Sequence, residues 1–160
     1  MASKTMKHLA ISRIGVDTMA YMNQEKKAKI ALRLKPILKK YGVKGTLSVR
    51  SHSTIVLTLK SGKIDFIENF IQTDSNVMHS RKMPQSQIDR IRKDRYLDAN
   101  PFWFQEHFTG AAKNFLTEAF AALKSADWYD RSDAQVDYFD TAYYTDVTVG
   151  KWNQPYEVTK

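Results

Sequence analysis

The 160-residue sequence contains no cysteine, which excludes disulfide bonds, thiol nucleophiles and zinc sites with cysteine ligands. It contains no apolar run close to the roughly 20 residues that a membrane-spanning helix needs. Residues Met1–Ile14 mix polar and apolar side chains, so they lack the apolar stretch of a signal peptide. Together these absences predict a soluble protein of the cytoplasm with no membrane partner.

Signatures of catalysis and of cofactor binding are missing as well. The four histidines, His8, His52, His79 and His107, are far apart in the sequence and belong to no zinc-binding motif. The glycines form no phosphate-binding loop, and no serine lies in a nucleophile elbow. The sequence therefore predicts no catalytic residue, no cofactor and no metal site, and it favours a binding protein over an enzyme.

One alternative that involves a metal stays open. Asp130, Asp133, Asp137 and Asp140 could converge on a divalent ion, and carboxylates around Mg²⁺ support phosphodiester cleavage. The same residues are also typical of Asx turns and of an acidic surface that complements a basic one, which is the interpretation we favour. An Asp-dependent metal nuclease is therefore the weaker hypothesis.

Charge is unevenly distributed along the chain, whose formal net charge is +8. Residues 1–95 carry 20 Lys and Arg against 7 Asp and Glu, whereas residues 96–160 carry 5 against 10. A basic block followed by an acidic, aromatic block predicts that only one part of the protein meets a polyanion or an acidic partner. The length predicts a single domain over residues 23–160, preceded by an N-terminal extension of residues 1–22.

A long basic helix is predicted over residues 24–41. Its apolar residues recur at helical spacing and lysine or arginine fills most of the remaining positions. Asn23 is a suitable N-cap and Gly42 a suitable stop. Pro36 removes a backbone donor in the middle of this segment, so we expect a kink or a restart there.

A β-hairpin is predicted to follow. Thr46–His52 alternates apolar and polar residues, and Thr54–Lys60 is rich in β-branched and apolar residues, as in a central strand. We expect Ser61-Gly62 to form a turn at the end of this hairpin. The apolar residues of segment 64–71 fit one face of a short helix, although a third strand is the alternative.

The rest of the chain is predicted to alternate between loops and regular elements. Residues 73–84 indicate an exposed connection, and residues 85–95 have too little apolar surface for an independently stable helix, which favours a mobile basic segment. A strongly amphipathic helix is expected over Thr109–Ser125, and a strand over Tyr143–Val149. Gly150–Asn153 is expected to be a turn with an aromatic anchor.

These elements predict an α+β fold, in which a central β-hairpin or small antiparallel sheet is packed by amphipathic helices and a C-terminal strand. The C-terminal segment begins with residues Asp127–Asp146, which alternate acids with aromatics. So many aromatic side chains are too costly to leave in water, and we expect this segment to pack onto its own domain or onto a partner.

Lysines and arginines near the middle of the chain are the candidate site for nucleic acid. Several cations together give sequence-tolerant, salt-sensitive binding, because each neutralised phosphate releases condensed counterions. The aromatics that follow this basic segment could stack a base, although core packing is expected for at least two of Tyr96, Phe102, Trp103 and Phe104. The predicted phosphate contacts are Arg81, Lys82, Arg90, Arg92, Lys93 and Arg95, with Lys35, Lys39 and Lys40 as a second row and Arg50 on the hairpin.

Several stretches resemble a known family. They are Tyr41–Gly62, Asn100–Trp103 with Gln105–Phe108, Asp137–Asp140 and Gly150–Asn153. Together they resemble the large polyvalent-protein-associated domain 29 family over about residues 25–158. That family occurs in phages, plasmids and other mobile elements, alone or within large proteins injected by phages, and it has no catalytic residues to carry over. The resemblance implies an accessory protein of a mobile element that acts in the host cell.

Two functions of different classes follow from the sequence. The leading hypothesis is a non-enzymatic protein that binds DNA or RNA through its basic half in the host cytoplasm. The rival hypothesis is an inhibitor or modulator of a host protein, such as a defence factor, which uses a charged or aromatic surface. The sequence leaves the partner open, and oligomers are compatible with either function.

Overall fold

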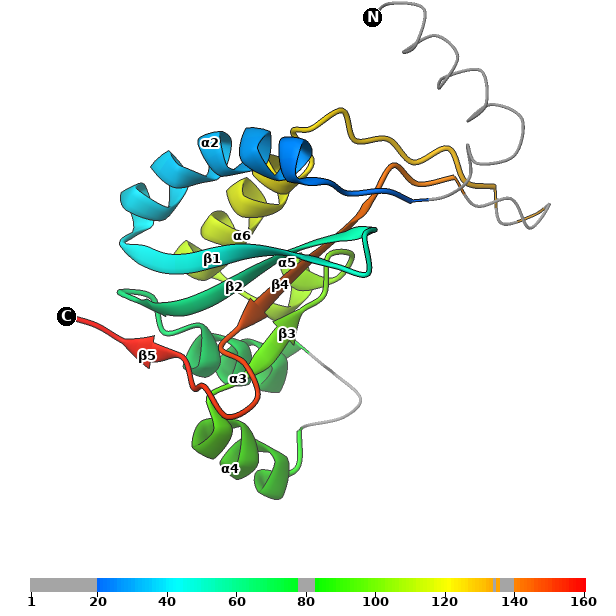
Figure 1. Ribbon diagram of the computed structural model, residues 1–160. Coiled ribbons are helices and arrows are strands. Elements are labelled where there is room, and N and C mark those ends of the chain that lie inside the picture. Colours follow the sequence, from blue (N-terminus) through cyan, green and yellow to red (C-terminus); the bar gives the residue numbers. More distant parts are fainter. Residues whose placement is uncertain (1–19, 78–82, 134, 136–139) are drawn as a thin grey trace, which may run out of the picture.

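The computed structural model describes residues 20–77, 83–133, 135 and 140–160. Within these residues, helices pack on one side of a small mixed sheet of five strands, which confirms the α+β class (Figure 1). None of the described helices is long and apolar enough to cross a membrane. The elements in chain order are α2 (Gln24–Tyr41), β1 (Val43–Arg50), β2 (Thr54–Gly62), α3 (Phe66–Val77), α4 (Gln85–Asp94), β3 (Leu97–Ala99), α5 (Phe104–His107), α6 (Gly110–Leu123), β4 (Tyr144–Val149) and β5 (Glu157–Val158).

Helix α2 has the predicted bounds and the predicted caps. The Asn23 side chain accepts a hydrogen bond from the backbone N–H of Lys26 at 2.8 Å, and Gly42 ends the helix in the left-handed conformation at φ 65°. The helix runs through Pro36 without the restart that the sequence suggested. Pro36 deprives the Leu32 carbonyl of its helical partner, but Leu32 is 78% exposed, so water can take that place.

The hairpin β1–β2 is confirmed, but its turn lies elsewhere than predicted. Ser51 and His52 adopt positive φ at the tip, where the Ser53 N–H donates to the Arg50 carbonyl. Ser61-Gly62, predicted to be a turn, belongs to β2 and pairs with the start of β1. Gly62 is needed for close approach, because an added Cβ would lie 2.9 Å from the Val43 Cα.

The sheet is mixed, whereas the sequence indicated an antiparallel one. The strand order is β1-β2-β4-β3, and β5 also pairs with β2. Strand β2 is antiparallel to β1 but parallel to β4 and β5, and β3 is antiparallel to β4. A parallel pair needs a long crossover, here the whole segment from α3 to α6. That crossover places the predicted C-terminal strand beside the centre of the sheet.

Residues 64–95 are more regular than the sequence indicated. The alternative of a third strand is wrong, because α3 begins at Phe66, where Asp65 accepts a hydrogen bond from the Glu68 N–H. The helix continues to Val77, and Thr73, placed in the expected exposed connection, is buried. Residues 85–94 form α4 rather than a mobile segment. Ile88 and Ile91 pack against the core, and these contacts stabilise a helix that the segment could not form on its own.

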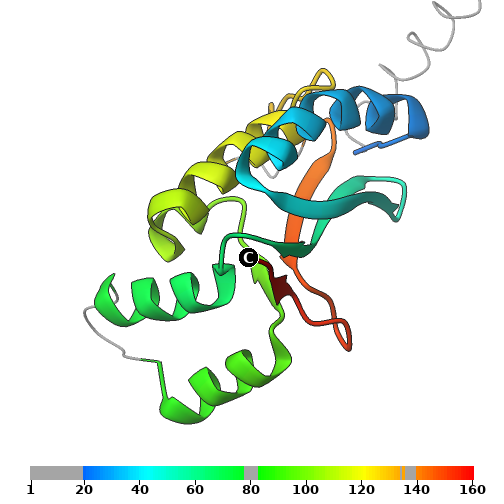
Figure 2. The same cartoon turned by 90° about the vertical axis from the view of Figure 1, so that its left-hand side faces the viewer.

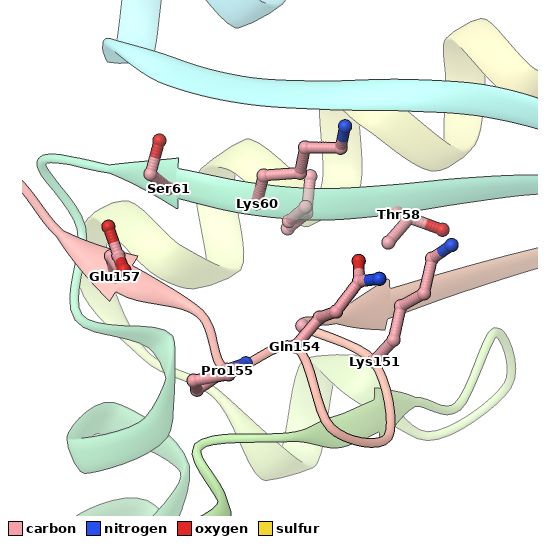
Figure 3. Close-up of a pocket in the computed structure, with 9 residues that line it drawn as sticks. Thr58, Lys60, Ser61, Lys151, Gln154, Pro155 and Glu157 are labelled. Carbon is pink, nitrogen blue, oxygen red and sulfur yellow. The ribbon is translucent and has the colours of Figure 1, made fainter.

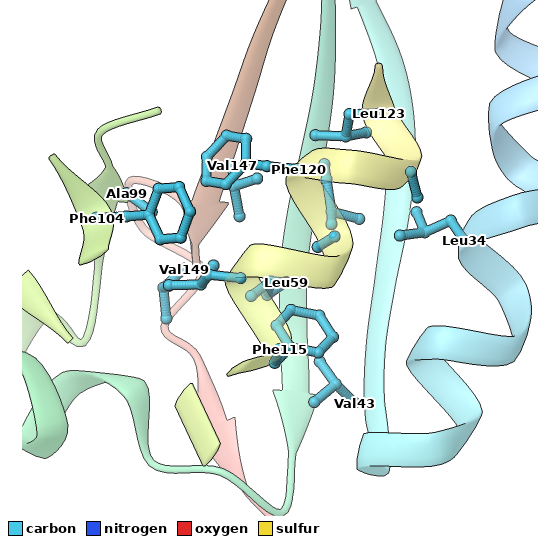
Figure 4. Packing of buried hydrophobic residues seen from close by; sticks show 14 of the residues in the cluster. Leu34, Val43, Leu59, Ala99, Phe104, Phe115, Phe120, Leu123, Val147 and Val149 are labelled. Carbon is cyan, nitrogen blue, oxygen red and sulfur yellow. The ribbon is translucent and has the colours of Figure 1, made fainter. Parts of the chain in front are cut away.

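The core lies between the sheet and the helices on one of its faces (Figures 1, 2 and 4). In β2 the side chains of Ile55, Leu57 and Leu59 are fully buried. Phe66 makes edge-to-face contacts with Phe108, Phe115 and Tyr156, with ring centroids 5.5–6.4 Å apart. The predicted apolar stripe of α6 is buried in full, namely Ala112, Phe115, Leu116, Ala119, Phe120 and Leu123.

Two aromatic residues of the acidic, aromatic segment, Tyr143 and Tyr156, pack onto its own domain. Tyr143 is fully buried, and its hydroxyl donates to the Leu123 carbonyl at 2.6 Å. Tyr156 is also fully buried, and its hydroxyl donates to the Ile64 carbonyl at 2.8 Å. Burial raises the pKa of Tyr156 far above that of a free tyrosine. Trp152, the expected aromatic anchor, is instead 81% exposed, so Tyr156 is the residue that anchors this end of the chain.

Gly110 and Gly150 both have positive φ, but only Gly150 is crowded, so substituting each one distinguishes the cost of the backbone conformation from the cost of a steric clash. Gly150 has φ 71°, and an added Cβ would lie 2.6 Å from the Arg95 carbonyl oxygen, whereas Gly110 has φ 58° and open space. We expect Gly110→Ala to lower the free energy of unfolding by about 1–2 kcal/mol, the cost of a left-handed non-glycine residue. Gly150→Ala should cost about 1–3 kcal/mol more, because of the clash. Urea unfolding measures both, and equal losses would contradict the packing described for Gly150.

Candidate nucleic-acid interface

The predicted phosphate contacts do not form one surface. Arg81 and Lys82 lie outside the described residues. The others are divided among α2, β1, α4 and Arg95 directly after α4, and α2 and α4 lie at opposite ends of the molecule in Figures 1 and 2. Four of them, Lys40, Arg50, Arg92 and Arg95, form ion pairs within the protein.

Arg95 connects three segments of the fold. Its Nη2 lies 3.1 Å from a carboxylate oxygen of Asp65 at the start of α3, and its Nε donates to the Tyr156 carbonyl at 2.9 Å. The Tyr156 N–H in turn donates to the Arg95 carbonyl at 2.9 Å. The side chain of Arg95 is only 28% exposed. The structure therefore uses Arg95 to hold the C-terminal segment, and not as a free phosphate ligand.

Two further candidates pair with acidic residues on the surface. Arg92 of α4 lies 2.7 Å from Glu68 of α3, and Arg50 at the end of β1 lies 3.0 Å from Asp146 of β4. Both arginine side chains are about half exposed, so each pair adds less than about 1 kcal/mol to stability. The pairs nevertheless reduce the positive charge that these arginines offer to a polyanion.

Lys40 belongs to a three-residue cluster at the contact between α2 and α6. Its ammonium group lies 3.1 Å from Glu118, which also accepts a hydrogen bond from the Tyr41 hydroxyl. The hydrogen bond from Tyr41, and then that from Lys40, holds the pKa of Glu118 below its ordinary value. The bond to Glu118 correspondingly raises the pKa of Tyr41 and of Lys40.

The outward face of α2 is where unneutralised cations gather. Lys35 and Lys39 from the predicted set are exposed there, with Lys29 and Arg33 from the same helix. None of these four takes part in an ion pair within the described residues. On α4, Arg90 and Lys93 are exposed as well. The sequence pattern already placed Lys29 and Arg33 on this helix, but it gave no reason to prefer them to the arginines after residue 80.

The predicted stacking aromatics have different environments. Phe104 is buried and stacks on Phe120 with ring centroids 4.7 Å apart, and Tyr96 is half-buried. Phe102 is 83% exposed and Trp103 is 53% exposed. The Asn100 side chain accepts hydrogen bonds from the N–H groups of both, which fixes this turn.

The aspartates of the weaker hypothesis form turns and an ion pair. The side chains of Asp130 and Asp133 each accept a hydrogen bond from the N–H two residues later, the pattern of an Asx turn. Asp140 is buried and lies 2.9 Å from Arg131. Asp137 lies outside the described residues. Among the described residues, no group of three or more His, Asp or Glu side chains is placed to hold a metal ion.

Comparison with protein-family models, with curated proteins and with solved structures gives no match to this chain. The resemblance to the large polyvalent-protein-associated domain 29 family therefore stays a prediction, and the functional argument rests on the geometry of the described residues.

The position of Arg95 predicts a structural effect for its removal. Arg95→Ala breaks a charged hydrogen bond to Tyr156 and the ion pair with Asp65, and should lower the free energy of unfolding by about 1.5–3 kcal/mol. Arg90→Ala, on the exposed surface of α4, should change it by less than about 0.5 kcal/mol. Urea unfolding of both variants tests this difference. Similar small changes would mean that Arg95 is as free to bind phosphate as Arg90.

The Glu118 cluster predicts a pH dependence of stability. The pKa of Glu118 is lower in the folded protein than the ordinary value of 4.5, so its ionised form stabilises the fold above that pH. This contribution is lost as the pH falls through the lowered folded-state pKa. The stability lost in Glu118→Gln should therefore be largest near neutral pH and shrink in acid, as measured by urea unfolding from about pH 3 to pH 7. Glu106→Gln, whose carboxylate is in none of the described ion pairs, should show no such trend.

Proposed function

We propose that this chain is a non-enzymatic accessory protein of a phage or other mobile element, and that it binds nucleic acid through the outward face of α2. The observation that supports this proposal is the contrast between the two basic regions. Near residue 95, Arg92 and Arg95 form ion pairs with Glu68 and Asp65. On α2, by contrast, four cations are exposed and outside the described ion pairs, namely Lys29, Arg33, Lys35 and Lys39.

The geometry of α2 suits a phosphate backbone. Lys29 and Lys39 are separated by ten residues, which is about 15 Å along a helix with a rise of 1.5 Å per residue. Lys35 lies between them along the helix axis, so the cations are spread along the helix. Helix α2 has seven Lys and Arg against one Glu, and only Lys40 among them is in an ion pair within the described residues.

Such a surface reads charge and not bases. It carries no arrangement of side chains for the groove edges of a duplex, so the expected binding is electrostatic, sequence-tolerant and strongly dependent on salt. Either DNA or RNA satisfies these contacts. The family resemblance adds the host cytoplasm as the place where the protein would act.

Two double variants of equal net charge distinguish the effect of losing the proposed site from the effect of losing positive charge in general. Lys35→Gln with Lys39→Gln removes two cations from α2, and Arg90→Gln with Lys93→Gln removes two from α4. In fluorescence anisotropy with a labelled 20-base-pair duplex from about 50 to 200 mM salt, the α2 variant should bind more weakly. Its plot of log affinity against log salt should be less steep by about 0.9 per lost contact.

The α4 variant should retain a slope close to that of the unchanged protein. Equal weakening of both variants would show an effect of net charge alone, and unchanged binding of the α2 variant would overturn the proposed interface. Glutamine preserves helix propensity, so circular dichroism should show both variants fully folded.

A second candidate function is supported by Phe102 and Trp103. Two large exposed aromatics on a turn fixed by Asn100 are typical of the anchors of a protein–protein contact. These two side chains favour the rival hypothesis, in which the protein inhibits or modulates a host protein. An association that survives salt concentrations at which nucleic acid dissociates, and that is lost on Trp103→Ser, would support this function over the first.

A further inference from the structure

The sheet has one face that no described helix covers, and two adjoining hollows lie on it. In Figures 1 and 2 the helices α2, α5 and α6 lie on the opposite face. The first hollow, of about 300 Å³, lies between the end of β2 and the connection from β4 to β5. The second, of about 390 Å³, lies over the middle of the sheet, and the two share Thr58 and Lys151. Their sizes fall in the range of small-molecule sites.

The first hollow offers donors to an anion. Lys60 comes from β2, and Lys151 and Gln154 come from the β4–β5 connection, with the Thr58 hydroxyl next to the last two (Figure 3). Neither lysine is in an ion pair within the described residues. The hollow has one carboxylate, that of Glu157, so its lining carries a net positive charge. Two ammonium groups with a hydroxyl and an amide are typical ligands of a phosphate group.

Both walls of this hollow are held by the backbone. Lys151 and Gln154 exchange two hydrogen bonds of 2.9 Å, and the Gly150 N–H donates to the Leu59 carbonyl at 2.8 Å. On the other wall, the register of β2 against β1 skips Lys60, because Gly45 pairs with Leu59 and Lys44 with Ser61. A bulge of this kind redirects a side chain and is common beside binding sites. The backbone that carries these donors is thus fixed before any ligand arrives.

The second hollow has a different chemical character. Its apolar lining comes from Tyr96, which is half-buried, and from Val56, which is only 7% exposed at the floor, and Arg50 lines the hollow while pairing with Asp146. Asp98 lies beside it, opposite Thr148 in the sheet register. The lining of the second hollow holds two cations, Arg50 and Lys151, and the carboxylates of Asp146 and Asp98 lie outside it, where they can accept hydrogen bonds from amino or hydroxyl groups. The cations of this face are therefore Lys60 and Lys151 at the first hollow and Arg50 and Lys151 at the second.

We propose that this uncovered face binds a nucleotide, with the phosphate at Lys60 and Lys151 and the base over Val56 beside Tyr96. The ligand is one nucleotide unit, which can be a free mononucleotide or part of a single strand. This site is separate from the cations of α2 and does not depend on the function proposed for them.

Isothermal titration with nucleoside 5′-monophosphates and with a pentanucleotide tests the proposal. We expect adenosine 5′-monophosphate or another of the four to bind with a Kd on the order of 0.1–1 mM at low salt. Lys60→Gln with Lys151→Gln should weaken this binding at least about tenfold, since it removes both ammonium groups. The matched control, Arg90→Gln with Lys93→Gln on α4, has the same net charge and should bind like the unchanged protein.

Two further readouts identify the site and the source of the ligand. Addition of nucleotide should shift the methyl resonances of Thr58 and Thr148, and adenosine without its phosphate should bind much more weakly. Tighter binding of the pentanucleotide than of the monophosphates, with the difference lost in the Lys60 and Lys151 variant, would identify a single strand as the source, and equal binding a free nucleotide. The proposal is overturned if none of these ligands binds at about 10 mM, or if the Lys60 and Lys151 variant binds as the control does.

Discussion

Strand β2 is the element on which the rest of the structure depends. Its residues Ile55, Leu57 and Leu59 are fully buried against the helices, and it pairs with β1 on one side and with β4 and β5 on the other. A strand whose two edges are both satisfied needs partners from distant parts of the chain. The parallel pairing with β4 therefore requires the intervening helices to cross over one face of the sheet, and none of the described helices covers the opposite face.

This pairing also decides which charges remain available. The fold places residues of the acidic block against residues of the basic block, so that Asp146 forms an ion pair with Arg50 and Glu118 forms one with Lys40. Arg95 is taken up by the C-terminal segment that follows β4. The large positive charge of residues 1–95 is thus reduced where the blocks touch. It persists on α2, whose outward face is turned away from the sheet, and in the two lysines beside the first hollow.

Local sequence patterns predicted most of the helices and strands, but they could not predict contacts between residues that are far apart in the sequence. Helix α2, the hairpin and the stripe of α6 follow from the spacing of apolar residues and from the caps Asn23 and Gly42. Strand β3 and helix α5 are too short to produce a periodic signal. The role of Arg95 depends on Asp65 and Tyr156, which are 30 and 61 residues away, so no local pattern separates it from Arg90. The hollow lined by Lys60 and Lys151 was missed for the same reason, since these lysines are 91 residues apart and reach it from β2 and from the connection between β4 and β5.

The proposed interface lies on the outward face of α2 and not on α4. Nuclear magnetic resonance tests this placement through the backbone amide shifts that a short duplex causes on titration. We expect the largest shifts on residues 29–39 of α2, and we expect them to fade as salt is raised. Shifts that are concentrated on residues 85–94 of α4, with α2 unaffected, would contradict this placement.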